Sequence, residues 1–145
     1  MVTKNSALAW CRAARTIGTC SNNVAIPRPI CTVADGVDEV RKAVREELRK
    51  GAAQIKLMLS GGVLSPSDPV WMDQYSKAEI RAAVEEAATR RTYVMAHAHT
   101  ASAARRCVDF GVRSIEHGSL IDRETAEYIA TSNAYVVPTL STIHM

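Results

Sequence analysis

The sequence has few of the features that mark secreted, membrane-bound or nucleic-acid-binding proteins. Among 145 residues there are one Phe, two Trp and four Tyr. The net charge is only +3, and no Lys/Arg run is dense enough to indicate a nucleic-acid or membrane surface. A short apolar run after Lys4 is interrupted by Arg12 and Arg15. We therefore expect neither a signal peptide nor a membrane span.

Cysteine is also scarce, and none of the four cysteines forms a Cys-x-x-Cys pair: Cys11, Cys20, Cys31 and Cys107. This spacing argues against a zinc ribbon or a thioredoxin motif. A reduced, cytoplasmic setting is the simpler expectation, and one disulfide among the first three cysteines stays open.

Histidine is absent before residue 97, and then three histidines follow within twenty-one residues. His97 and His99 end an apolar stretch that begins at Tyr93 and predicts a strand. Because alternate side chains on a strand share a face, both histidines should point the same way. His117 follows a second apolar stretch, and His144 near the C-terminus is expected to be solvated.

The chain alternates between helical and extended patterns. Apolar spacing predicts helices over residues 35–50, 76–90, 101–110 and 122–132, and strands over 54–59, 93–99, 113–116 and 135–138. Expected caps are Asp35, Ser76 with Glu79, and Asp122, and expected helix ends are Gly51, Gly111 and Asn133. Residues 1–32 form an irregular N-terminal segment in this interpretation, with a short helix over 7–17 and a loop over 20–29. Residues 33–145 form an α/β domain with a parallel sheet.

Three predicted strands end in residues suited to chemistry: Lys56, His97 with His99, and His117. The carboxyl ends of parallel strands meet at one edge, where α/β proteins bind ligands. Each residue alone has an ordinary explanation, such as a paired lysine or a turn histidine before Gly118. Together they favour one shared site. Glu116 is the obvious acid to pair with Lys56, but strand alternation places it on the face opposite to His117.

Several motifs in order resemble the metal-dependent amidohydrolase superfamily, in the branch related to imidazolonepropionase and prolidase-like dipeptidases that cleave Xaa-Lys/Arg bonds. They are Ile55-Lys56, Ser60-Gly61-Gly62-Val63, Ser65-Pro66-x-Asp68-Pro69, Ala96-His97-Ala98, Ser114-Ile115-Glu116-His117-Gly118 and Val137-Pro138-Thr139-Leu140. The resemblance implies part of a (β/α)8 barrel, about the fourth to seventh strands with their helices.

The resemblance also implies a metal centre with one or two divalent ions, zinc being the expected one. Lys56, as a carboxylated lysine, His97 and His117 would be the metal ligands. His99, Gly61 and Gly62 would contact the substrate, a dipeptide or N-acyl amino acid. The implied reaction is hydrolysis of an amide C–N bond by a metal-activated hydroxide.

Two parts of the family pattern are missing from the sequence. No His-x-His pair precedes Lys56, and Asp122 lies only five residues beyond His117, where a helix starts, so it does not match the eighth-strand general base. We therefore assign no catalytic residue and expect this chain alone to be inactive. Since a complete barrel needs about 250 residues, the chain resembles a slice of one.

Two alternatives remain at this stage. One is a non-catalytic α/β domain that binds metal at most weakly and self-associates through open sheet edges, with the strand at Gln54 and the strand at Tyr135 as those edges unless residues 1–32 cover one. The other is a lyase that uses Lys56 for a Schiff base, which would leave His97 and His117 unexplained.

Overall fold

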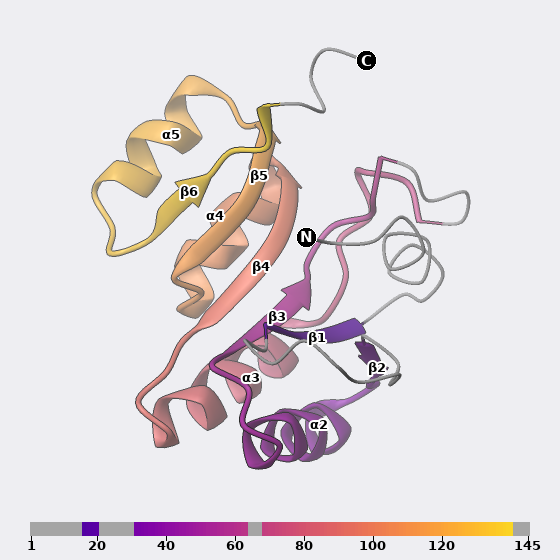
Figure 1. Ribbon diagram of the computed structural model, residues 1–145. Helices are drawn as coiled ribbons and strands as arrows, with labels where there is room; N and C mark the ends of the chain where they lie inside the picture. The colour runs from indigo at the N-terminus through magenta and orange to yellow at the C-terminus, as the bar shows by residue number, and fades with distance from the viewer. Residues whose placement is uncertain (1–15, 21–30, 64–67, 141–145) are drawn as a thin grey trace.

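The computed structural model describes residues 16–20, 31–63 and 68–140, and they form one six-stranded sheet with helices packed on it (Figure 1). The strand order is β2-β1-β3-β4-β5-β6. The strands are β1 (Thr16–Cys20), β2 (Cys31–Val33), β3 (Gln54–Met58), β4 (Val94–Thr100), β5 (Ser114–Leu120) and β6 (Tyr135–Val137). The last four are parallel, whereas β1 is antiparallel to both β2 and β3.

Helices alternate with the parallel strands, as the sequence pattern predicts. They are α2 (Val37–Arg49), α3 (Lys77–Thr89), α4 (Ala101–Phe110) and α5 (Arg123–Ala130). In the described part of the chain, no helix is both long and apolar enough to span a membrane.

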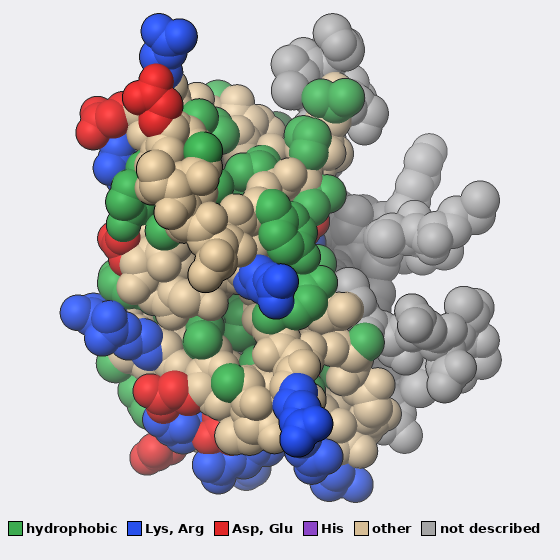
Figure 2. Space-filling view, turned by 90° about the vertical axis from the view of Figure 1, so that its left-hand side faces the viewer, with side chains coloured by type: hydrophobic (Ala, Val, Ile, Leu, Met, Phe, Trp, Pro, Cys, Tyr) green, Lys and Arg blue, Asp and Glu red, His purple; other side chains and the backbone are tan. Residues whose placement is uncertain are grey.

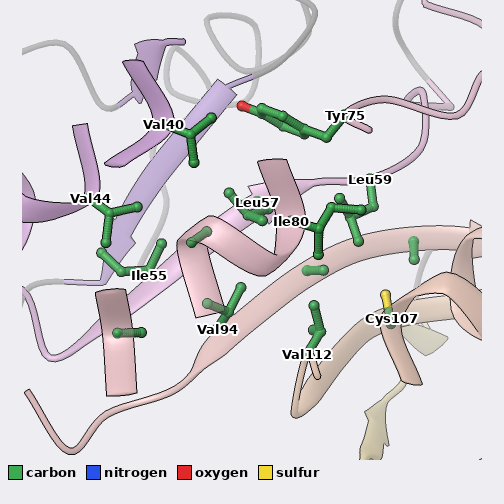
Figure 3. Packing of buried hydrophobic residues seen from close by; sticks show 14 of the residues in the cluster. Val40, Val44, Ile55, Leu57, Leu59, Tyr75, Ile80, Val94, Cys107 and Val112 are labelled. Atoms are coloured by element: carbon green, nitrogen blue, oxygen red, sulfur yellow. The ribbon is translucent and has the colours of Figure 1, made fainter. Parts of the chain in front are cut away.

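The core lies between the helices and one face of the sheet (Figure 3). Ile55 and Leu57 of β3 are fully buried, and they pack with Val40 and Val44 of α2 and Ile80 of α3. Burial of each such side chain contributes roughly 1.5–3 kcal/mol. The opposite face of β3 and β4 carries Lys56, Met95 and the two histidines, so the sheet separates the packed core from the polar site.

Local signals set most helix ends. Ser76 and Glu79 form the predicted capping box, and the side chain of Asp122 accepts a hydrogen bond from the Thr125 amide. Gly111 ends α4 with a left-handed φ of 91°, and Gly51 follows α2 with a φ of 92°. These predictions are confirmed, because the local hydrogen bonds that they require are made within the helix ends themselves.

Two predicted caps are wrong. The N-cap of α2 is Gly36, not Asp35, and no side chain of its own turn caps the helix. The Gly36 amide itself donates to Glu79 at 2.8 Å, so a residue distant in sequence anchors the start of the helix. Asn133 is not left-handed, because α5 ends at Thr131 with right-handed helical geometry.

The N-terminal segment contributes strands where an irregular structure was expected. Ile17, placed by the pattern in a short helix, lies in β1 opposite Leu57, since pairing with the edge of β3 overrides the local helical pattern. β1 thereby covers the edge of β3, which would otherwise be open. Thr16, also placed in that helix, lies in β1 as well, whereas residues 7–15 of the predicted helix and 21–29 of the predicted loop lie outside the described residues.

Candidate metal centre

Strand β4 brings two histidines to its carboxyl end. His97 and His99 alternate along the strand, and their side chains point to the same face of the sheet. They are 7% and 4% exposed, so both imidazoles are buried. Their ring centroids are 4.6 Å apart with nearly perpendicular planes. The shared face predicted from the spacing is therefore observed.

His117 of β5 joins them because its backbone leaves the regular strand geometry. Its φ is 80°, a left-handed value that is rare for a residue with a side chain. The ring lies 4.7 Å from that of His97 and 4.9 Å from that of His99, centroid to centroid. The shift of register between β4 and β5 after Ala98 accompanies this change of course.

The same irregularity overturns the expectation for Glu116. Glu116 aligns with His97 across the two strands, and its carboxylate accepts a hydrogen bond of 2.5 Å from the Ser114 hydroxyl. Glu116 and His117 therefore lie on the same side of the sheet. Alternation fails here because the positive φ of His117 turns its side chain back toward the face of the preceding residue.

The three imidazoles form a donor set that suits a transition metal. One ring nitrogen from each of His97, His99 and His117 lies within 4.8 Å of the others. Within the described ranges this is the one group of three or more potential ligand side chains. Neutral imidazole is a preferred ligand of zinc and other divalent transition metals, so the residues present fit such an ion.

Burial keeps these rings neutral. Loss of hydration lowers the pKa of His97 from 6.5 to about 3 and that of His117 to about 4. The pKa of His99 is lowered for the same reason. The positive charge of Lys56 also acts on His97 and His117 in this direction. At neutral pH the rings therefore present lone pairs, as metal ligands must.

Hydrogen bonds hold each ring by one nitrogen. The Nε2 atom of His97 lies 3.0 Å from the carbonyl oxygen of Gly61. Because a carbonyl only accepts, Nε2 carries the proton and Nδ1 keeps its lone pair. The Nδ1 atom of His117 lies 2.6 Å from the hydroxyl of Thr139, and Nδ1 of His99 lies 3.4 Å from that of Ser119.

Lys56 lies on the same face as the histidines but one step further from the carboxyl end. It aligns with Met95, whereas Met58, two residues later, aligns with His97. Its side chain is half-buried. The structure thus groups His97, His99 and His117 most closely and sets Lys56 beside them on the next strand.

Gly61 and Gly62 begin the loop between β3 and α3, which folds back on itself next to β4. The Gly61 amide donates to Met72 at 3.0 Å, and the Gly62 amide donates to Asp68 at 3.2 Å. A Cβ on Gly61 would lie 2.0 Å from the Pro69 carbonyl oxygen. Only glycine fits at this position, and its carbonyl is thereby fixed against His97.

Three residues at the site or at the loop beside it had no predicted role. The hydroxyl of Ser60 accepts from the His99 amide at 3.1 Å. Arg106 of α4 donates to the carbonyls of Gln74 and Tyr75, which holds the end of the loop. Thr139 contacts His117 directly. The motifs that contain Ser60 and Thr139 signalled their importance, but not the atoms that they contact. His144 lies outside the described residues.

Comparison with known proteins places these observations in a family. The model of the amidohydrolase family matches residues 5–145. Ochratoxinase from Aspergillus niger is 41% identical over 117 residues, which are 81% of this chain and 24% of that protein. The chain thus spans about a quarter of the length of this curated relative.

Solved structures agree. A prolidase complexed with N-methylphosphonate-L-proline is 52% identical with a TM-score of 0.75, over 82% of this chain and 31% of that one. A Xaa-Pro dipeptidase with methionine bound in its active site is 35% identical with a TM-score of 0.70, over 82% and 29%. The predicted fold, an α/β chain that forms part of a (β/α)8 barrel, is confirmed.

Proposed function

The chain belongs to the amidohydrolase family. We propose that it supplies the histidine ligands of a divalent metal centre that hydrolyses an amide C–N bond. One observation carries this proposal. Three neutral imidazoles from β4 and β5, two buried and that of His117 half-buried, converge at the carboxyl ends of parallel strands, with ring nitrogens within 4.8 Å of one another. Ligand sites of α/β barrels lie at this end of the sheet.

The proposed metal ligands are His97, His117 and Lys56. His97 fits because the Gly61 carbonyl holds its Nε2–H and leaves Nδ1 unprotonated. Lys56 is half-buried beside two neutral rings, and carboxylation of its amine would give hard oxygen ligands. We propose zinc, since it accepts nitrogen and oxygen ligands together. When bound, such an ion supplies Lewis acidity to a substrate carbonyl and to a water molecule.

The chain's own residues would orient the substrate beside this centre. His99 contacts the rings of both His97 and His117, and Gly61 and Gly62 open the adjoining loop. We therefore propose that these three residues contact the substrate. The named relatives act on ochratoxin or on Xaa-Pro dipeptides, as their names state. A dipeptide or an N-acyl amino acid is the corresponding substrate class here.

In the part of the chain that the structure describes, Asp122 does not match the eighth-strand aspartate that the family resemblance implies. Asp122 is engaged as the cap of α5, where it accepts from the Thr125 amide at 2.7 Å. A general base must reach the proton that it removes. We therefore propose that the 145-residue chain alone does not turn over substrate. The second candidate function is a non-catalytic domain with weak metal affinity. It is favoured because no His-x-His pair precedes Lys56, so the sequence holds fewer metal ligands than the family pattern.

Zinc titration by calorimetry, together with hydrolysis assays on dipeptides and N-acyl amino acids, tests these proposals. We expect one zinc ion to bind, with His97→Ala and His117→Ala removing binding, Lys56→Ala weakening it, and exposed Lys42→Ala leaving it unchanged. We expect no hydrolysis above a zinc-containing blank. Absence of zinc binding in the unaltered chain would refute the metal centre, and steady turnover that Lys56→Ala abolishes would refute inactivity.

A further inference from the structure

Residue His117 reaches the cluster at a conformational cost. Its φ of 80° lies in the left-handed region, which is sterically unfavourable for a residue with a Cβ atom. Gly118 follows with a φ of 58°, and a Cβ there would lie 2.9 Å from a methyl carbon of Val136. The irregular part of β5 at His117 and Gly118 is thus packed tightly against β6. A strained residue persists only where its surroundings over-determine it.

The contact that acts on the imidazole itself comes from Thr139. Thr139 follows β6 by two residues, and β6 pairs with β5 through Glu116 and Val137. This pairing brings the half-buried Thr139 hydroxyl to 2.6 Å from Nδ1 of His117. The ring also stacks on His99, with 18° between their planes. Stacking alone does not prevent a 180° flip of the ring about its Cβ–Cγ bond. The hydroxyl, by contrast, contacts one particular ring nitrogen.

We infer that Thr139 is a positioning residue that holds His117 in its Nδ1–H tautomer and thereby directs the unprotonated Nε2 to the metal centre. Because a hydroxyl can donate or accept, the contact itself allows either tautomer. The inferred one is that in which the hydroxyl oxygen accepts from Nδ1–H, because it leaves the lone pair on Nε2, the nitrogen that Thr139 does not contact. A neutral imidazole carries one proton, so a proton fixed on Nδ1 leaves the lone pair on Nε2. His97 is held in the opposite sense, since its Nε2–H donates to Gly61. The effect on metal affinity rests on the proposed function, whereas the tautomer does not.

Nitrogen-15 NMR of the metal-free chain tests the tautomer directly. Correlations between the ring nitrogens and the carbon-bound ring protons separate protonated from unprotonated nitrogen for each histidine. We expect His117 to be Nδ1–H and His97 to be Nε2–H in the unaltered chain. In Thr139→Val, which keeps the shape but removes the hydroxyl, His117 should shift toward Nε2–H while His97 stays unchanged. Thr139→Ser keeps the hydroxyl and should keep His117 in its Nδ1–H form.

Zinc titration provides the second measurement. Loss of a hydrogen-bond partner behind a ligating histidine typically costs about 10–100-fold in metal affinity. We expect such a loss for Thr139→Val and a change of less than about threefold for Thr139→Ser. If zinc binds and Thr139→Val alters neither affinity nor tautomer, the inference fails while the metal centre stands. If Thr139→Val does not fold, an Nε2–H His117 in the unaltered chain would still overturn it.

Discussion

The carboxylate of Glu79 links its own helix to Gly36, 43 residues earlier in the chain. One oxygen accepts from the Gly36 amide at 2.8 Å at the start of α2, and the other accepts from the Ser76 amide at 2.6 Å at the start of α3. Glu79 is 4% exposed. A single buried side chain therefore satisfies backbone amides at the beginnings of two neighbouring helices, which fixes them against each other.

Replacement of this side chain should destabilise the chain. Glu79→Gln exchanges one acceptor oxygen for an amide donor that faces a backbone N–H, so we expect a loss of about 1–3 kcal/mol in the free energy of unfolding. Urea denaturation followed by circular dichroism measures it. Glu127→Gln, at a side chain that is 71% exposed, is the matched control and should stay within about 0.5 kcal/mol. Equal midpoints for the two variants would contradict this role of Glu79.

A second buried acid should make stability depend on pH. Arg45 donates two hydrogen bonds to Glu86, at 2.7 and 2.8 Å, and Arg41 donates a third at 2.8 Å. These contacts, Arg45 first, hold the pKa of the Glu86 carboxyl below its ordinary value of 4.5. The lowered pKa means that the folded state binds this proton less readily than the unfolded state. Its stabilising contribution is therefore complete above about pH 4.5 and is lost as the pH falls through the lower folded-state pKa.

We therefore expect Glu86→Gln to lower stability by about 1–2 kcal/mol at pH 7, toward the low end because the Arg45 side chain is largely exposed. The difference between this variant and the unaltered chain should shrink as the pH falls below about 4.5 and through the lower folded-state pKa of Glu86. Thermal melts across this range measure it. A constant difference at every pH would show that the carboxylate charge is not responsible.

Sequence patterns predicted the elements whose signals are local. Ser76 with Glu79, Asp122 and Gly111 each form contacts within a few residues, so their roles followed from spacing. Asp35 is not the cap because the N-cap of α2 lies one residue later, at Gly36, whose amide donates to Glu79, far away in sequence. Ile17 failed as a helical residue because β3 offers a strand edge. Such competition from tertiary partners is invisible in a local window.

The candidate site divides in the same way. The common face of His97 and His99 follows from strand alternation. The position of His117 does not, because its positive φ reverses the alternation that placed Glu116 opposite to it. The hydroxyl of Thr139 and the carbonyl of Gly61 act on ring nitrogens of residues distant in sequence. Residue type alone cannot reveal which oxygen meets which nitrogen.

Gly61 provides a third prediction, through the lack of space around it. An alanine Cβ would lie 2.0 Å from the Pro69 carbonyl oxygen, so the loop must move and take the Gly61 carbonyl away from His97. We expect Gly61→Ala to lose about 1–3 kcal/mol of stability and to weaken zinc binding. Gly51→Ala is the control, because Gly51 has a φ of 92° but open space around it. That variant should lose roughly 1 kcal/mol and keep its zinc affinity. Equal zinc affinity in Gly61→Ala and Gly51→Ala would show that the loop at Gly61 does not support the metal centre.

The last prediction concerns the edge of the sheet at β6. Among the described strands β6 pairs with β5 alone, and large apolar side chains beside this edge are exposed: Tyr135 and Val137 at 42%, Leu120 at 61% and Leu140 at 67%. Hydrophobic side chains also lie at the surface between charged ones on the side seen in Figure 2. Edge strands with exposed apolar side chains recruit other chains. We therefore expect the chain to self-associate in a concentration-dependent manner.

Val137→Lys adds a charge on this edge and should shift the population toward monomer in sedimentation velocity. Val63→Lys, at a loop residue that is 62% exposed, adds the same charge elsewhere and should leave association unchanged. A chain that stays monomeric at every concentration would contradict the prediction, and equal effects of the two lysines would assign association to net charge instead of to β6.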